Sequence, residues 1–209
     1  MTSEAYEAVL FDFGGVLTTP VWDSFAAYCR SQGLEPDAIK QLLREDPAAL
    51  AELRRLETGA LTESEFERSL AGRLGISDPE GLIDAIFAGM RAEPAMVEAV
   101  RELRRAGLKT ALVSNSWSVN HYDRELLAAL FDQSLISGEL GMHKPQPQIF
   151  ELAAERLGAA PESCIFVDDL RENCRGAEAV GMTAVLHRSA AETIGLLGEL
   201  TGIALAAPA

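Results

Sequence analysis

Carboxylates and a lysine lie at widely separated points of the chain, and their types and settings suggest chemistry. Asp12 comes directly after the apolar run 9–11, and Asp168-Asp169 follow a second apolar run. A carboxylate can act as a nucleophile or as an oxygen ligand for a hard cation. Lys144, in a loop segment, can offset negative charge. Each residue also has an ordinary explanation, because Asp forms turns and caps helices and most lysines are solvated.

Two further pairs of small or polar residues accompany these groups. Gly14-Gly15 come soon after Asp12, and glycine lets the backbone turn sharply and approach a ligand closely. Ser114-Asn115 end another apolar run and offer a hydroxyl and an amide. By themselves Ser114-Asn115 fit a turn or a helix cap. The joint occurrence of the four segments favours a functional site over unrelated turns.

Short apolar runs alternate with helical patterns from residue 94 onward. Strands are expected at 108–113, 134–136, 164–167 and 183–186, in addition to the one that ends at Asp12. Helices are expected at about 94–106, 123–130, 147–157 and 171–180. This alternation predicts an α/β fold with a Rossmann-like parallel sheet and right-handed crossovers. Ligands bind beyond the carboxyl ends of such strands, so the polar strand ends are expected to converge.

The segment from Trp22 to Met90 has a helical pattern throughout. Thr62 and Glu65 have the spacing of a capping box, and Asp78-Pro79 indicate the start of a helix to about residue 90. These residues look like a helical bundle inserted after the first strand. We therefore expect a core formed by residues 1–17 and 92–209 and a helical cap formed by residues 18–91.

Composition limits the class of partner. The chain has 209 residues and a formal net charge of -14, which repels a nucleic-acid backbone. No apolar run approaches the roughly 20 residues of a membrane span. The three cysteines, Cys29, Cys164 and Cys174, show no paired spacing, and no charged and apolar leader precedes Tyr6. We expect a cytoplasmic protein that binds neither nucleic acid nor membrane, as a monomer or a homodimer.

The order of four motifs resembles the haloacid dehalogenase superfamily of hydrolases. The motifs are DFGGVL, LVSNS, GMHKPQPQIF and FVDDLRENCRGAEAVGM. Within the superfamily the likeness is greatest to the amino-terminal phosphatase domain of soluble epoxide hydrolases, and it extends to Trp117 and to Thr201-Gly202-Ile203. The inserted segment resembles the C1-type cap of the superfamily. The resemblance implies a Mg²⁺-dependent phosphatase that hydrolyses a phosphate monoester of a small organic substrate.

The resemblance also implies roles for the acidic residues. Asp12 would be the nucleophile and would form an aspartyl phosphate, which divides a difficult hydrolysis into two steps. The metal site would consist of Asp12, the backbone carbonyl of Gly14 and Asp169, with Asp168 nearby.

The remaining motif residues would handle the phosphoryl group. Ser114 and Asn115 resemble the pair that donates hydrogen bonds to the phosphoryl oxygens. Lys144 resembles the lysine that offsets the charges of nucleophile and phosphate. Asn173, four residues after Asp169, is expected to orient this loop or the lysine.

One position departs from the pattern of the superfamily. Most of its phosphatases have a second Asp two positions after the nucleophile, which serves as acid and base, and here that position is Gly14. His121 and Asp123 are the nearest candidates for a substitute, and His121 also fits a plain surface residue. We expect that Gly14→Asp does not abolish activity and even raises it on substrates with poor leaving groups.

Other readings of the chain remain open at this stage. One alternative is a 2-haloacid dehalogenase, which also lacks the second Asp. Against it, the acidic pair 168–169 without a cation would repel a carboxylate substrate. A catalytically weak or inactive binding domain of the same fold is another alternative. Trp22, Phe25 and Trp117 could line a substrate cavity, or could simply pack the cap against the core.

Overall fold

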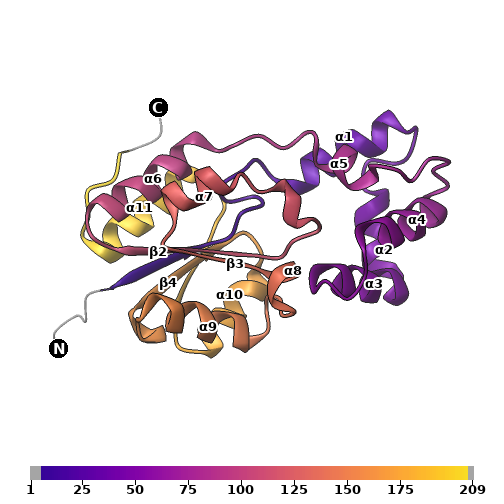
Figure 1. The fold of residues 1–209 in the computed structure, drawn as a ribbon. Helices are drawn as coiled ribbons and strands as arrows, with labels where there is room; N and C mark the ends of the chain where they lie inside the picture. Colours follow the sequence, from indigo (N-terminus) through magenta and orange to yellow (C-terminus); the bar gives the residue numbers. More distant parts are fainter. Residues whose placement is uncertain (1–5, 207–209) are drawn as a thin grey trace.

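Five parallel strands form one sheet in the order β3-β2-β1-β4-β5 in the computed structural model, which describes residues 6–206 (Figure 1). The central strand β1 pairs with β2 on one side and β4 on the other, and its four residues are completely buried. A strand buried on both faces needs an unbroken apolar run, which β1 has. The strands are β1 (Ala8–Phe11), β2 (Lys109–Ser114), β3 (Gln133–Ile136), β4 (Cys164–Asp168) and β5 (Thr183–Leu186).

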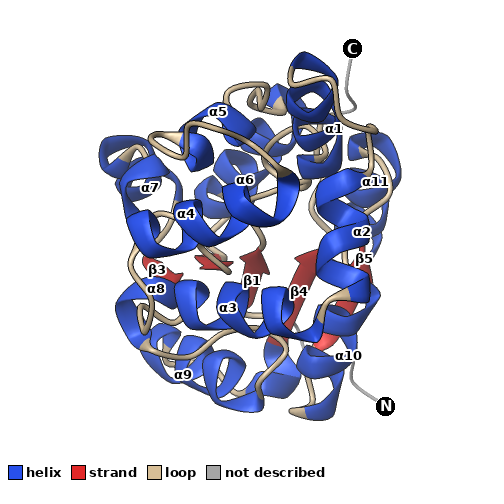
Figure 2. Cartoon of the chain, turned by 90° about the vertical axis from the view of Figure 1, so that its right-hand side faces the viewer, coloured by secondary structure: helices blue, strands red, loops and turns tan. Residues whose placement is uncertain are grey.

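Helices cover both faces of the sheet (Figure 2). Val9 and Phe11 face a layer that includes α6 and α11, whereas Leu10 faces α9 and α10, because successive side chains of a strand point to opposite faces. The predicted α/β fold with a parallel sheet is thus confirmed. The helices of the core are α6 (Pro94–Arg105), α7 (Arg124–Leu130), α8 (Ser137–Leu140), α9 (Pro147–Leu157), α10 (Arg171–Ala179) and α11 (Ala190–Thr201).

The inserted helices form a cap beyond the carboxyl ends of the strands (Figure 1). They bury a hydrophobic cluster of their own, and Thr62 and Glu65 make the predicted capping box. Thr18 and Ala92 form an antiparallel bridge where the chain leaves the core and returns. The division between core and cap at these positions stays a prediction. The cap helices are α1 (Val21–Ser31), α2 (Ala38–Glu45), α3 (Pro47–Glu57), α4 (Glu63–Leu74) and α5 (Leu82–Phe87).

The expected helix from Pro79 to about Met90 is shorter than predicted. It begins at Leu82 because Gly81 adopts a left-handed conformation, with φ +70°, that interrupts the helical path after Pro79. Within residues 6–206, no helix combines the length and the apolar character that crossing a membrane requires.

Candidate active site

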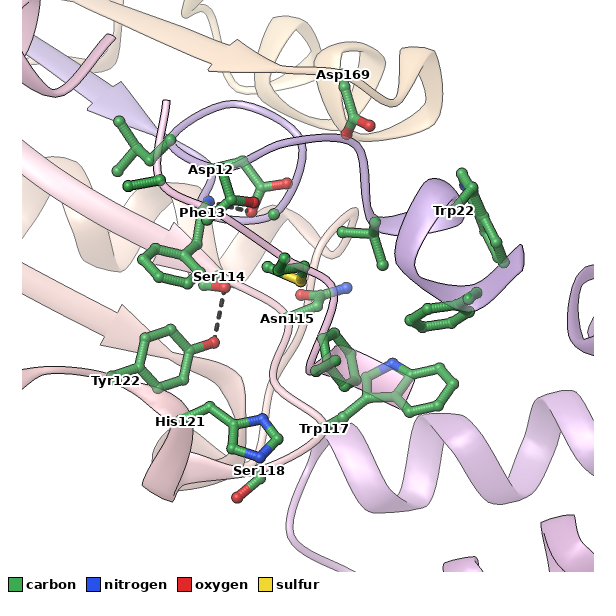
Figure 3. A pocket seen from close by; sticks show the side chains of 18 of the residues that line it. Asp12, Phe13, Trp22, Ser114, Asn115, Trp117, Ser118, His121, Tyr122 and Asp169 are labelled. Atoms are coloured by element: carbon green, nitrogen blue, oxygen red, sulfur yellow. Dashed lines mark hydrogen bonds between the residues drawn. The ribbon is translucent and has the colours of Figure 1, made fainter. Parts of the chain in front are cut away.

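The polar ends of three neighbouring strands meet where the sheet faces the cap. A cavity of about 610 Å³ lies there, between the strand ends and the cap helices. Asp168 ends β4 directly behind the cavity wall and is fully buried. The structure therefore brings together the motif residues that the sequence placed far apart. The predicted site residues that line the cavity are Asp12, Gly14, Ser114, Asn115, Lys144, Asp169 and Asn173 (Figure 3 shows several of them).

Lys144 joins two carboxylates at the floor of the cavity. Its Nζ lies 2.7 Å from Asp12 Oδ1 and 2.7 Å from Asp168 Oδ2, and its side chain is 1% exposed. Burial lowers the pKa of Lys144, but the charges of the two carboxylates outweigh burial and hold that pKa above its usual value. Lys144 is therefore a fixed positive charge beside Asp12.

Asp12 has one engaged oxygen and one free oxygen. Its Oδ1 accepts hydrogen bonds from Lys144 Nζ and, at 2.7 Å, from the backbone N–H of Phe13. Within residues 6–206, no donor contacts Oδ2. Burial raises the pKa of Asp12, while the Lys144 ammonium opposes that shift. The arrangement orients Asp12 and leaves Oδ2 available for attack on a ligand.

Asp168 holds the lysine from behind. Its Oδ1 accepts a hydrogen bond of 2.8 Å from the backbone N–H of Leu170, and both of its oxygens accept from Asn173 Nδ2, at 3.1 and 3.0 Å. Because Asp168 also accepts from Lys144, Asn173 acts on the lysine through this carboxylate. Asn173 is thus linked to the lysine indirectly, and its role in orienting Lys144 stays a prediction.

The acidic residues fit a hard cation. Asp12, Asp168 and Asp169 each offer a carboxylate oxygen, and these oxygens lie within 4.8 Å of one another. Burial, and then the charge of Asp168, raise the pKa of Asp169 to about 6, although the positive charge of Lys144 opposes this shift. Asp168 is fully buried and both of its oxygens are hydrogen-bonded, whereas Asp12 and Asp169 line the cavity and hold the ligand atoms that a cation can reach. Oxygen donors of this kind suit Mg²⁺.

A glycine lets the loop after β1 approach Asp169. Gly15 has φ +78°, and a Cβ at this position would lie 2.6 Å from Asp169 Oδ2. A side chain here would be strained and would displace the carboxylate. Gly15 therefore explains how the loop and the second acidic segment lie against each other.

Ser114 and Asn115 occupy the expected place but have additional partners. Ser114 Oγ lies 2.9 Å from the hydroxyl of Tyr122, which is itself buried (Figure 3). Asn115 Nδ2 donates to the Lys144 carbonyl at 3.0 Å, and Asn115 Oδ1 accepts from the Lys144 N–H at 2.8 Å. One N–H of the amide remains for a ligand, because an asparagine amide carries two. Asn115 thus fixes the lysine loop as well as facing the cavity.

The space that a second Asp would need beside the nucleophile is filled. A Cβ at Gly14 would lie 2.7 Å from Val21 Cγ2, at the start of α1. Valine is stiff at χ1, so this methyl cannot easily turn away. An acidic side chain at position 14 would therefore collide with the first residue of α1.

The two sequence candidates for a substitute acid have other contacts. His121 Nε2 lies 2.5 Å from Asp84 Oδ1 of the cap, on the wall of the cavity. Asp123 is exposed and is the N-cap of α7, where it accepts from the backbone N–H groups of Glu125 and Leu126. Asp123 has a capping role that the sequence reasoning did not assign to it.

Aromatic rings form the far wall of the cavity. Phe25 contacts Trp22, Phe87 and Trp117, each with ring centroids 5.2 Å apart. Trp117 belongs to the core and the other rings belong to the cap, so the cluster both packs the two parts together and lines the cavity. The two readings of these residues are compatible.

The sequence reasoning missed two residues at the site. Tyr122 follows Ser114 by eight positions and contacts it, and a tyrosine in the segment after β2 was a usable signal. Glu57, the last residue of α3, lines the cavity from the cap. No local pattern marks Glu57, because only the position of the cap brings it there.

Known proteins share this sequence pattern. A family described as haloacid dehalogenase-like hydrolase matches residues 6–181. Bifunctional epoxide hydrolase 2 from Rattus norvegicus is 32% identical over 225 residues, which cover 95% of this chain and 39% of the relative. The chain thus spans about two fifths of the length of the epoxide hydrolases that it matches. Phosphatase MT3486 from Mycobacterium tuberculosis is 32% identical over 213 residues, which cover 94% of each protein.

Solved structures share the fold. The had family enzyme bt-2542 from Bacteroides thetaiotaomicron superposes with a TM-score of 0.70 at 20% identity, over 93% of this chain and 99% of that one. A mutant of that enzyme was solved in complex with magnesium and inorganic phosphate. Because the family match extends over most of the chain, the chain belongs to the haloacid dehalogenase-like hydrolases.

Proposed function

We propose that the protein is a Mg²⁺-dependent phosphatase that hydrolyses a phosphate monoester of a small organic molecule through an aspartyl phosphate on Asp12. The observation that carries this proposal is the position of Lys144 Nζ, 2.7 Å from Asp12 Oδ1 on the floor of the cavity. A carboxylate nucleophile must approach an anion, and a fixed ammonium beside it reduces the repulsion. Relatives named as phosphatases support the same reaction class.

Each residue of the site has a role in this reaction. Asp12 Oδ2 attacks phosphorus, and the aspartyl phosphate is then hydrolysed by water. Ser114 Oγ and the free N–H of Asn115 donate to the phosphoryl oxygens, and Lys144 offsets their charge. Asp168 is a positioning residue because it holds Lys144 in place.

The metal would be held by carboxylate oxygens of the acidic cluster that face the cavity. Asp12, through the oxygen that does not attack phosphorus, and Asp169 would bind it with the backbone carbonyl of Gly14, and Mg²⁺ supplies positive charge against the phosphoryl oxygens when it is bound. In support, burial and the neighbouring carboxylates raise the pKa of both Asp12 and Asp169, and a bound cation would offset this crowding of negative charge.

The cavity favours a substrate with an apolar portion. Its volume of about 610 Å³ leaves room for an organic group beyond the phosphate, and aromatic side chains form its far wall. Aromatic walls hold apolar or flat groups through contact area. We therefore propose a substrate in which the phosphate is attached to such a group.

Release of nitrophenol from p-nitrophenyl phosphate tests this function. Activity should require Mg²⁺ and should disappear in Asp12→Asn, because the amide has the same shape but cannot act as the nucleophile. Asp23→Asn, an exposed residue of α1 outside the cavity, is the matched control and should keep full activity. Metal-independent release of halide from 2-haloacids would instead indicate a dehalogenase, and inactivity in both assays would indicate a binding domain.

A further inference from the structure

We propose that Glu57 of the cap is the catalytic acid and base of this enzyme, in the place of the carboxylate that position 14 lacks. The inference rests on the proposed phosphatase function. It starts from a need that the site leaves open, because Val21 fills the space beside Gly14 and an alkoxide is a poor leaving group without a proton.

The core holds Glu57 at the edge of the cavity. Glu57 ends α3 and lines the same cavity as Asp12 and Lys144. Two residues later, Gly59 has φ +71°, and a Cβ there would lie 2.9 Å from the backbone carbonyl oxygen of Gly138 in α8. The segment that follows α3 thus lies close against the core, where only a glycine leaves room for this approach. Glu57 is thus positioned by both parts of the protein.

Glu57 is half-buried and has a free carboxylate. Within residues 6–206, it forms neither a side-chain hydrogen bond nor an ion pair. Asp84, another cap carboxylate on the cavity wall, is in contrast mostly exposed and bonded to His121. Among the cap carboxylates that line the cavity, Glu57 is the one left for a ligand.

The charges around Glu57 suit proton transfer near neutral pH. Burial raises the pKa of Glu57 to about 7, and the opposing positive charges come from Lys144 of the core and Arg54 of its own helix. A carboxyl group with such a pKa is present in both protonation states at neutral pH. Proton donors and acceptors work best when their pKa lies near the working pH.

The geometry of phosphoryl transfer places the leaving group on the side of the cap. The attacking and leaving oxygens lie roughly in line on opposite sides of phosphorus. With Asp12 on the floor, the ester oxygen therefore points into the cavity toward the cap. As the bond from Asp12 Oδ2 to phosphorus forms and the ester bond breaks, the Glu57 carboxyl gives its proton to the leaving oxygen and the alcohol departs.

The second step returns the proton. The Glu57 carboxylate takes a proton from the attacking water as its oxygen bonds to phosphorus. The bond from phosphorus to Asp12 then breaks and leaves the Asp12 carboxylate and inorganic phosphate. Glu57 ends protonated, ready for the next turnover.

Two substrates of similar size separate this role from a structural one. Benzyl phosphate has a leaving group that needs a proton, whereas nitrophenolate leaves without one. In Glu57→Gln, kcat on benzyl phosphate should fall by about 10² to 10⁴. The first turnover of p-nitrophenyl phosphate should persist as a burst, followed by slow turnover because the water lacks its base. Glu80→Gln, an exposed cap residue outside the cavity, is the matched control and should behave as the parent protein.

The pH profile supplies a second readout. In the parent protein, turnover of benzyl phosphate should decrease as the pH rises through about 7, since Glu57 must be protonated to donate. Glu57→Gln should lack this decrease, and Glu57→Asp should retain it at reduced activity.

Two results would overturn the proposal. One is a Glu57→Gln protein that turns over benzyl phosphate within a few-fold of the parent. The other is a folded Glu57→Gln protein that also loses the first-turnover burst of p-nitrophenyl phosphate, because nitrophenolate leaves without a proton. Failure of the phosphatase function itself looks different, because the parent protein would then release no phosphate at all.

Discussion

Replacement of Lys144 by methionine tests the charge balance on which the site depends. Methionine has a similar length but no charge, so Lys144→Met leaves Asp12 and the buried Asp168 facing each other without a counter-charge. The side chains of Lys144 and Asp168 are 1% and 0% exposed, so water cannot screen the loss. Removal of one partner of a buried ion pair costs about 3–5 kcal/mol, and we expect this decrease in the free energy of unfolding at pH 8.

The destabilisation caused by Lys144→Met should become smaller as the pH falls. Without Lys144 the two carboxyl groups can avoid repulsion by taking up a proton, so the folded variant binds protons that the unfolded chain releases. Stability of Lys144→Met should therefore rise relative to the parent between pH 8 and pH 5.5. Urea denaturation without metal, monitored by the fluorescence of Trp22 and Trp117, measures the free energy of unfolding of both proteins at pH 8 and at pH 5.5.

A second substitution makes the test specific. Asp168→Asn in the Lys144→Met background removes one of the two unpaired charges and should recover part of the lost stability. Loss of a solvent-exposed ion pair costs below about 1 kcal/mol, so a decrease of that size in the free energy of unfolding of Lys144→Met at pH 8 would refute the reasoning. So would a double variant that is no more stable than Lys144→Met.

Three further predictions follow from other contacts. Gly14→Asp should lower the free energy of unfolding by about 1–3 kcal/mol because its Cβ meets Val21 Cγ2, and Val21→Ala in the same chain should relieve this cost in thermal melting and raise activity on poor leaving groups. Tyr122→Phe should cost about 1 kcal/mol through the lost bond to Ser114 and should lower kcat/KM for the phosphate substrate, whereas unchanged values in both assays would contradict a positioning role. Affinity for Mg²⁺ should weaken below pH 6, where Asp169 takes up a proton, and calorimetric titrations at pH 5 and pH 7 that agree would contradict this.

The strands were predictable because each is a short apolar run that ends in a polar residue. The parallel sheet buries both faces of β1, and such burial leaves a clear trace in the sequence. The helix α11 was not predicted. Its amphipathic signal is weak, and the helix is stabilised by the Ser189 cap and by burial of Ile194 and Leu197 against the core. The helix α11 therefore depends on tertiary packing, which the local sequence pattern does not reveal.

The candidate site also contains residues that the sequence predicts and residues that it does not. Asp12 was predicted from its place at a strand end, whereas Lys144 was predicted from its resemblance to the lysine of the superfamily motif, and the fold places the two side by side. The double contact of Asn115 with the Lys144 backbone depends on how two loops meet, which no spacing reveals. Glu57 and Val21 reach the site only through the placement of the cap, so no local pattern marks either residue as part of it.

The contact between Val21 and Gly14 makes the two parts of this protein interdependent. A chimaera that joined this core to an insertion beginning with alanine would gain room for a methylene group at position 14. Conversely, this insertion grafted onto a relative with aspartate there would force a valine methyl against the new side chain. Exchange of insertions among such enzymes therefore has to include the first residue of α1 as part of the catalytic unit.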